Sequence, residues 1–175
     1  MAAPLRPTAT KAYLRNKWVF VPTIANTAAP TAVELTGASS LDVTNMLFAS
    51  SATPTQSTNL ARAPKRLGDA ATFEFVGESQ ASFGEVRYSF DPQSAALSNG
   101  RKAFEKFPAG TTGYFYNRLG LSQDVDVIAT HKVTGYPVEF GPQVETKEGD
   151  DEGAEVAIVQ TVAQTGPTVL NVAVV

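Results

Sequence analysis

The sequence predicts a mainly β protein, an antiparallel β-sandwich or barrel with one flanking α-helix. Three observations support this fold class. The chain contains 18 valines and 19 threonines, and β-branched side chains suit a pleated, half-buried surface. Short segments of alternating apolar and polar residues recur between clusters of Gly, Pro, Ser and Asn. Only one segment, residues 94–107, places apolar residues at helical spacing.

The length and composition predict a single domain with an arm. A chain of 175 residues fits one domain. Residues 1–16 are rich in Ala, Pro and Thr and have no periodicity, so we expect an N-terminal arm followed by one β-rich domain over residues 17–175. The absence of cysteine excludes disulfides and thiolate metal sites. The longest apolar runs are too short to cross a bilayer, and no apolar segment follows the N-terminal basic residues, so neither a membrane partner nor a signal peptide is expected.

The first strand is expected over residues 17–24. Alternation places Trp18, Phe20 and Ile24 on one face and two valines on the other. Pro22 suggests an edge position or a bulge, because proline cannot donate to a strand ladder.

Two further short strands are expected at residues 32–35 and 41–48. Residues 49–70 follow as a long polar loop. A structureless insert of this length is uncommon in a compact domain and indicates function or disorder.

The clearest strand alternation lies at residues 72–76 and 84–90. Phe73 and Phe75 share one face of the first segment, and every second residue of the other is apolar. A short segment containing Gly and Ser separates the two, so we expect them to be antiparallel neighbours.

In the second half, residues 94–107 are expected to form the single helix, which ends at Pro108. Gly100 weakens its middle, and two shorter helical pieces are an alternative. An acidic loop is expected at residues 145–155. Strands are expected at residues 113–119, 125–130, 136–140, 155–163 and 168–174, the last two as a hairpin.

No catalytic motif is present, and the chain is not expected to be an enzyme or to hold a cofactor or metal. His131 is the only histidine and has no motif partner; we expect a solvent-facing or inter-subunit strand residue. The sequence has no nucleophile elbow and no phosphate-binding glycine loop. The acidic cluster lacks the ligand spacing of an EF-hand loop and fits a solvated loop better than a cation site.

The charge is unevenly distributed. The net charge is −3, which argues against a surface that binds nucleic acid throughout. Residues 1–88 carry 8 basic and 6 acidic side chains, whereas residues 89–175 carry 6 basic and 11 acidic ones. The basic group Arg62, Lys65 and Arg66 has no interleaved aromatic residues for base stacking.

Taken in order, these segments carry a family resemblance. The relevant stretches are an N-terminal arm leading into WVFVP (18–22), LDVTN (41–45), the long loop, the paired strands near Phe75 and Tyr88, the helix ending at 104–107, GTTGYFYNR (110–118), DVDV (124–127), YPVEFG (136–141) and the closing hairpin. Over nearly its whole length the chain resembles the major tail protein, or tail tube protein, of long-tailed, siphovirus-like bacteriophages.

The resemblance implies a structural virion protein. Its protomers would close into hexameric rings that stack into the tail tube, the conduit for DNA ejection, after assembly in the host cytoplasm. The implied partners are other copies of the chain, the tape-measure protein, and the tail terminator and tip proteins. Genomic DNA would pass through without specific binding. The alternative is a capsid-decoration or host-binding β-sandwich module, which would not polymerise into tubes.

Two sets of contact residues are expected within such a tube. Opposite charges steer association and fix register, so the basic long loop is expected to meet the acidic loop between rings. An acidic lumen would repel phosphate, and alternation places two aspartates on one face of the expected strand at 125–130. The inter-ring candidates are Asn59, Arg62, Lys65, Arg66, Glu148, Asp150, Asp151 and Glu152, and the lumen candidates are Asp124 and Asp126.

Overall fold

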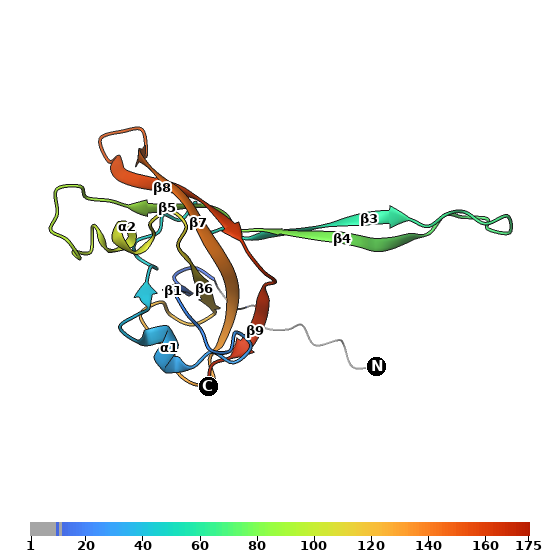
Figure 1. The fold of residues 1–175 in the computed structure, drawn as a ribbon, viewed down its shortest axis with the longest axis horizontal. Coiled ribbons are helices and arrows are strands. Elements are labelled where there is room, and N and C mark those ends of the chain that lie inside the picture. Colours follow the sequence, from blue (N-terminus) through green and yellow to red (C-terminus); the bar gives the residue numbers. More distant parts are fainter. Residues whose placement is uncertain (1–9, 11) are drawn as a thin grey trace, which may run out of the picture.

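The fold is a curled antiparallel sheet from which one long hairpin projects (Figure 1). The computed structural model describes residue 10 and residues 12–175, so most of the expected N-terminal arm lies outside the described residues. The mainly β fold class is confirmed, with two short helices in place of the single helix expected.

The larger sheet has the strand order β2-β1-β6-β7-β8-β5, with β9 also paired to β7, and β3 and β4 form a separate two-stranded sheet. All pairs are antiparallel. The strands are β1 (Asn16–Val21), β2 (Leu41–Asp42), β3 (Thr55–Arg62), β4 (Glu74–Ser82), β5 (Gly84–Ser89), β6 (Thr112–Leu119), β7 (Lys132–Glu148), β8 (Glu155–Gln164) and β9 (Val169–Ala173). The helices are α1 (Ala32–Thr36) and α2 (Lys102–Lys106).

Strand β1 separates two hydrophobic cores, as its apolar faces predict. Trp18 and Phe20 pack into an aromatic core inside the curled sheet. Val19 and Val21 pack into a second core on the other face. Ile24 belongs to this second core, not to the face of Trp18 as expected, because the strand ends before Pro22 and its alternation does not continue.

The aromatic core is centred on β6. The ring of Phe115 lies 5.1 Å from that of Phe83, 5.5 Å from that of Phe20 and 5.7 Å from that of Phe140. Aromatic pairs at these separations add to the free energy gained by burial alone. All four rings are buried, so this core holds the curled sheet together.

The segment expected as a strand at residues 32–35 is helix α1, so that prediction was wrong. Thr31 and Glu34 form a capping box: the Glu34 backbone N–H donates to Thr31 Oγ1 at 3.1 Å, and the Thr31 N–H donates to Glu34 Oε2 at 2.8 Å. This local capping outweighs strand propensity. Backbone N–H groups of Ala25 and Thr31 lower the pKa of the Glu34 carboxyl. The strand expected at 41–48 is reduced to β2 and one isolated bridge at Leu47.

The helix expected over residues 94–107 is also wrong in extent, since only α2 is helical. Upstream of it, Ser94 Oγ donates to the carbonyl of Asp91 and bonds Ser98 Oγ at 2.7 Å. Such local side-chain bonds compete with helix formation. Gly100 packs against Asp91 so closely that a Cβ would lie 2.9 Å from the Asp91 Cβ. The second of the two shorter pieces considered for this segment is therefore the helical one.

Strands β4 and β5 are consecutive but do not pair, contrary to expectation. Strand β4 pairs with β3, which lies inside the segment expected as a long loop, and β5 pairs with β8. The buried Phe83 anchors the junction in the aromatic core. Gly84 follows with φ +85°, a conformation that favours glycine, and redirects the chain from one sheet into the other.

Strands β8 and β9 do not form the expected hairpin. Both run antiparallel to β7 along the same edge, β8 against residues 138–148 and β9 against residues 132–135. Residues 165–168 interrupt this edge, since Pro167 has no N–H to contribute to a ladder.

Candidate assembly surfaces

The β3–β4 hairpin extends well clear of the body (Figure 1). Its register pairs Thr55 with Ser82 at the base and Arg62 with Glu74 near the tip, and a bulge falls between Thr58 and Leu60. Nearly all of its residues are exposed. An isolated two-stranded hairpin is only marginally stable in water, and the projecting part gains little stability from the rest of its own chain.

The two halves of the hairpin differ in chemistry. The base, residues 55–58 and 79–82, consists of Ser, Thr, Gln and Ala, with Thr58 Oγ1 bonded to Ser79 Oγ at 3.0 Å. The distal half, residues 60–63 and 73–76, carries large apolar side chains that are more than half exposed: Leu60, Phe73, Phe75 and Val76. Exposed apolar groups at this density mark an interaction site.

The basic candidates lie along and beyond this distal half. Asn59 sits at the bulge, and Arg62 Nε is 3.7 Å from Glu74 Oε1 in an exposed pair. Lys65 and Arg66 are exposed in the tip. The tip is closed by Asp69, whose carboxylate accepts from the Arg66 backbone N–H at 2.8 Å. The turn therefore presents the basic side chains outward.

The acidic segment is only partly a loop. Residues 145–148 belong to β7, residues 149–154 form the turn, and β8 begins at Glu155. Asp151 is used locally, because its Oδ1 accepts from the Gly153 N–H at 3.0 Å. Asp150 lies 3.9 Å from Lys147 in an exposed pair, and Glu152 is exposed. These three side chains form the solvated part of the acidic cluster.

Glu148 differs from the other acidic candidates. Its Oε2 accepts from Arg87 at 3.1 Å, and its Oε1 accepts from Ser50 Oγ at 3.2 Å. The hydrogen bond between Arg87 and Glu148, together with the negative charge of Glu148, raises the pKa of the Arg87 guanidinium. Glu148 therefore stabilises the protomer's own surface and is less available to a partner.

The basic tip and the acidic turn lie far apart in one protomer. In Figure 1 the hairpin extends to the right, whereas the turn joining β7 and β8 lies at the upper left. A contact between them must therefore join two copies.

The lumen candidates lie in the irregular β6–β7 connection, residues 120–131, and the strand expected at 125–130 is absent from the described structure. Asp124 accepts from Ser122 Oγ at 3.4 Å. Asp126 is 3.4 Å from Lys17 Nζ, which also contacts Asp42 at 3.1 Å. Both aspartates are exposed, but the charge of Asp126 is partly balanced by the buried Lys17.

Buried cations explain why this segment is not a strand. Arg118, 1% exposed, donates to the carbonyl oxygens of Ser122 at 2.6 Å and Asp126 at 2.9 Å. Lys17 Nζ donates to the carbonyl of Val125 at 3.4 Å. Two carbonyls of the expected strand, those of Val125 and Asp126, and the carbonyl of Ser122 just before it are thus occupied by side chains.

His131 is a half-buried part of this connection. Its Nδ1 accepts from the Ile128 backbone N–H at 3.3 Å and lies 3.4 Å from Arg118 Nη1. Desolvation and then the Arg118 charge lower its pKa. The neutral form of His131 therefore stabilises this connection.

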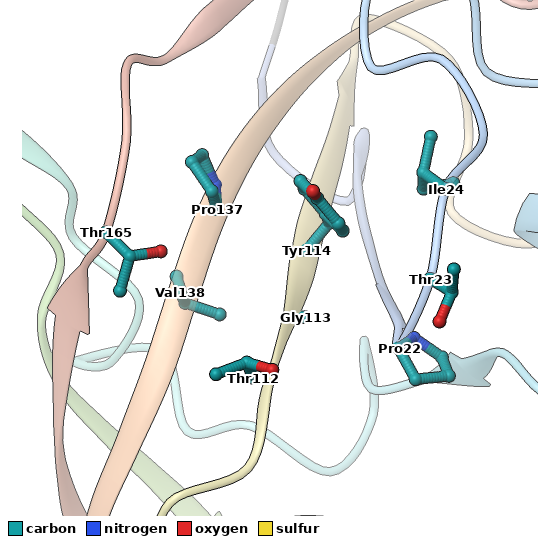
Figure 2. Close-up of a pocket in the computed structure, with 9 residues that line it drawn as sticks. All are labelled: Pro22, Thr23, Ile24, Thr112, Gly113, Tyr114, Pro137, Val138 and Thr165. Atoms are coloured by element: carbon teal, nitrogen blue, oxygen red, sulfur yellow. The ribbon is translucent and has the colours of Figure 1, made fainter.

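A shallow cavity of about 200 Å³ lies at the opposite end of β6 (Figure 2). Its walls come from β6, from β7, and from the segments that follow β1 and β8; Tyr114 and Pro137 lie on the two neighbouring strands. The lining groups are apolar or are Thr and Tyr hydroxyls, without a charged side chain. Within the described residues, no group of three or more His, Asp or Glu side chains could hold a metal ion.

The distal apolar residues of the hairpin were not among the sequence candidates. The available signal is the pair Phe73 and Phe75, which the sequence predicts on a strand that pairs with residues 84–90. Among the described residues, no helix is long and apolar enough to span a membrane.

Comparison with known proteins gives one result that covers almost the whole chain. No curated protein matches the sequence. A family model described as phage tail tube protein matches residues 4–175. The chain belongs to the phage tail tube protein family, and is thus a structural component of a virion tail.

Proposed function

We propose that this protein forms hexameric rings that stack into the tail tube of a siphovirus-like phage, the conduit for DNA ejection. The observation that supports this proposal is the β3–β4 hairpin, whose exposed apolar distal half projects beyond its own chain. Family members build tubes from many copies, so neighbouring copies can cover this surface. A head-to-tail contact that is repeated from ring to ring and does not close on itself produces an extended assembly.

Within the tube, the basic hairpin tip contacts the acidic turn of a copy in the next ring. Lys65 and Arg66 supply the positive side, with Asn59 and Arg62 behind them on β3. Asp150, Asp151 and Glu152 supply the negative side, with Glu148 at its edge. Because these groups are exposed, their attraction sets register and weakens as salt rises.

The remaining assignments concern the finished tail. The lumen is net negative, with Asp124 and Asp126 as lining candidates, so that DNA slides without salt-dependent attraction. The tape-measure protein occupies the tube before ejection, and terminator and tip proteins close its ends. The protein works without catalysis or a cofactor and assembles in the host cytoplasm.

Electron microscopy of the purified protein and of a shortened variant tests the assembly. The variant lacks residues 58–79, and an Asn-Gly turn joins Ser57 to Gln80, which are paired in the register. We expect the parent to form tubes and the variant to remain a folded protomer, with a cooperative urea unfolding transition like that of the unassembled parent. Long tubes from the variant, or a parent that stays monomeric with or without tail partners, would contradict the proposal; the second result favours a decoration module.

Charge reversal tests the partner of the hairpin tip. The double variant Lys65→Glu, Arg66→Glu is expected to reduce tube formation, and adding Asp150→Lys and Asp151→Lys is expected to restore it. The matched control, Lys132→Glu on β7, changes the net charge away from both surfaces and should assemble normally. Failure of the second pair to rescue would place the tip against a different surface.

A further inference from the structure

The apolar residues of the distal hairpin lie on both of its faces. Leu60 is directly opposite Val76 in the register, and Ala61 is opposite Phe75. Because successive side chains alternate between faces, the first pair lies on one face and the second on the other. Leu60 is 64% exposed, Phe75 54% and Val76 71%.

Pairing continues beyond the strands with the same division. The Ala63 N–H donates to the Phe73 carbonyl at 2.8 Å, which places Phe73 two residues before Phe75 on the same face. This face therefore carries two phenylalanines flanked by alanines, whereas the other carries the aliphatic pair and the Arg62–Glu74 ion pair.

A hairpin that lies flat on one neighbour needs an apolar residue only at every second position. Strands that are apolar on both faces are typically buried on both. Strand β1 of this protein follows that rule, with Trp18 and Phe20 in one core and Val19 and Val21 in the other. The distal hairpin has the same two-faced pattern, but within one protomer both faces are open.

The base of the hairpin provides an internal contrast. Ser57 and Gln80 on one face, and Thr58 and Ser79 on the other, are all small or polar and exposed. The change from polar to apolar occurs at the bulge, on both faces together. The bulge therefore separates the polar base of the hairpin from its apolar distal half.

We propose that the distal hairpin is inserted between two walls of protein, both supplied by other copies of this chain, while the base remains in contact with water. The inference rests on the proposed tube, because the assembly of a tail tube from one repeated chain provides the copies. The positive charge of the adjacent tip also favours other copies of this chain as the partner, since the acidic turn of a second copy complements Lys65 and Arg66.

Cysteine labelling can test this directly, because the chain has no cysteine. Val76→Cys reports on the aliphatic face, Ala61→Cys on the phenylalanine face, and Gln80→Cys on the base. Maleimide labelling is measured on protomers and on assembled tubes of each variant. We expect labelling in tubes to slow at least about tenfold at positions 76 and 61, and less than about threefold at position 80.

The outcomes separate this inference from the function on which it rests. If the parent chain forms no tubes, the proposed function fails. If tubes form but either distal position still labels at the protomer rate, the two-walled site is wrong while the tube stands. Slowed labelling at all three positions contradicts a solvated base and overturns the boundary at the bulge.

Substitutions provide a second readout. Phe75→Ser and Val76→Ser act on opposite faces, and each is expected to reduce tube yield at least tenfold without changing urea unfolding of the protomer. Gln80→Ser is the matched control and should leave tube yield unchanged. If only one of the two distal variants impairs assembly, the hairpin is covered on one face.

Discussion

Phe115 in the body and Phe75 in the hairpin occupy strands of similar regularity, yet the first is fully buried and the second is 54% exposed. Phe115 lies in a buried cluster of aromatic side chains from its own chain. Phe75 projects from a two-stranded ribbon outside both cores. The body therefore contains the apolar contacts that fold the protomer, and the hairpin contains the exposed apolar residues that we propose for assembly.

The charges follow the same division. In the body, buried Lys17 and Arg118 bind carbonyl and carboxylate oxygens of the β6–β7 connection. In the hairpin, Lys65 and Arg66 point into solvent. Buried cations of the first kind fix a loop, whereas exposed cations of the second kind steer a partner.

The largest expected effect compares Phe115→Ala with Phe75→Ala. Removing a fully buried phenylalanine costs about 3–5 kcal/mol, so Phe115→Ala should greatly lower the free energy of unfolding of the protomer. Phe75→Ala removes an exposed side chain, and a change within about 0.5 kcal/mol is expected. Urea unfolding of unassembled protein measures both. A loss above about 1 kcal/mol for Phe75→Ala would contradict the division between folding and assembly.

Arg118→Met should have the next largest effect. The substitution keeps an apolar stem but leaves two partly buried carbonyl oxygens without their charged donor, at a cost of about 3 kcal/mol. Proteolysis in residues 120–131 should also become faster, because these bonds hold the connection. Arg62→Met is the control, since that guanidinium is exposed and pairs with Glu74 on the hairpin. Equal destabilisation by the two variants would show that Arg118 has no special role.

A pair of glycines sharpens the comparison at smaller magnitude. A Cβ on Gly113 would lie 2.5 Å from Phe20 Cζ, whereas a Cβ on Gly68 in the hairpin tip meets no atom within 4 Å. Overpacking of this kind costs about 1–3 kcal/mol, so Gly113→Ala should destabilise the protomer by that amount and Gly68→Ala should not. Thermal unfolding of both variants is the measurement. A stable Gly113→Ala would mean that both the Phe20 ring and the Val21 carbonyl, which the Cβ would meet at 2.8 Å, can move aside.

The parts predicted correctly from sequence include those with a dense run of large apolar residues. Strand β1 and strand β6 have large apolar residues on both faces, and both lie close to the expected positions. Strand β3 could not be recognised, because its run of Thr, Gln, Ser and Asn is also typical of a loop. It becomes a strand by pairing with β4, whose Phe75 and Val76 carry the stronger signal.

Tertiary contacts account for the error at residues 125–130, whereas the errors at residues 32–35 and 94–107 come from the local hydrogen bonds described above. The segment around Asp124 and Asp126 alternates as a strand does, but buried side chains of Lys17 and Arg118 occupy its carbonyls. Sequence spacing contains no information on those two cations. The inter-ring contact stays a prediction: Lys65, Arg66 and Asp150 are exposed, whereas Glu148 is half-buried against Arg87. The separation of the hairpin tip from the acidic turn follows only from the three-dimensional arrangement.

The smallest expected effect is a pH dependence that belongs to the body and spares the hairpin. Burial and Arg118 lower the pKa of His131 below its ordinary value of 6.5, so the unfolded chain takes up a proton at a higher pH than the folded chain. The stabilisation is therefore complete above about pH 6.5 and is lost as the pH falls toward the folded-state pKa. In His131→Asn, the amide oxygen can accept from the Ile128 N–H without titrating. Urea midpoints at pH 7.5, 6.5 and 5.5 should fall more steeply for the parent than for this variant. Equal dependence of the urea midpoint on pH in the parent and in His131→Asn would assign the loss of stability to other titrating groups. The variant with the shortened hairpin should show the same pH dependence as the parent; a different dependence would mean that the hairpin contributes to it.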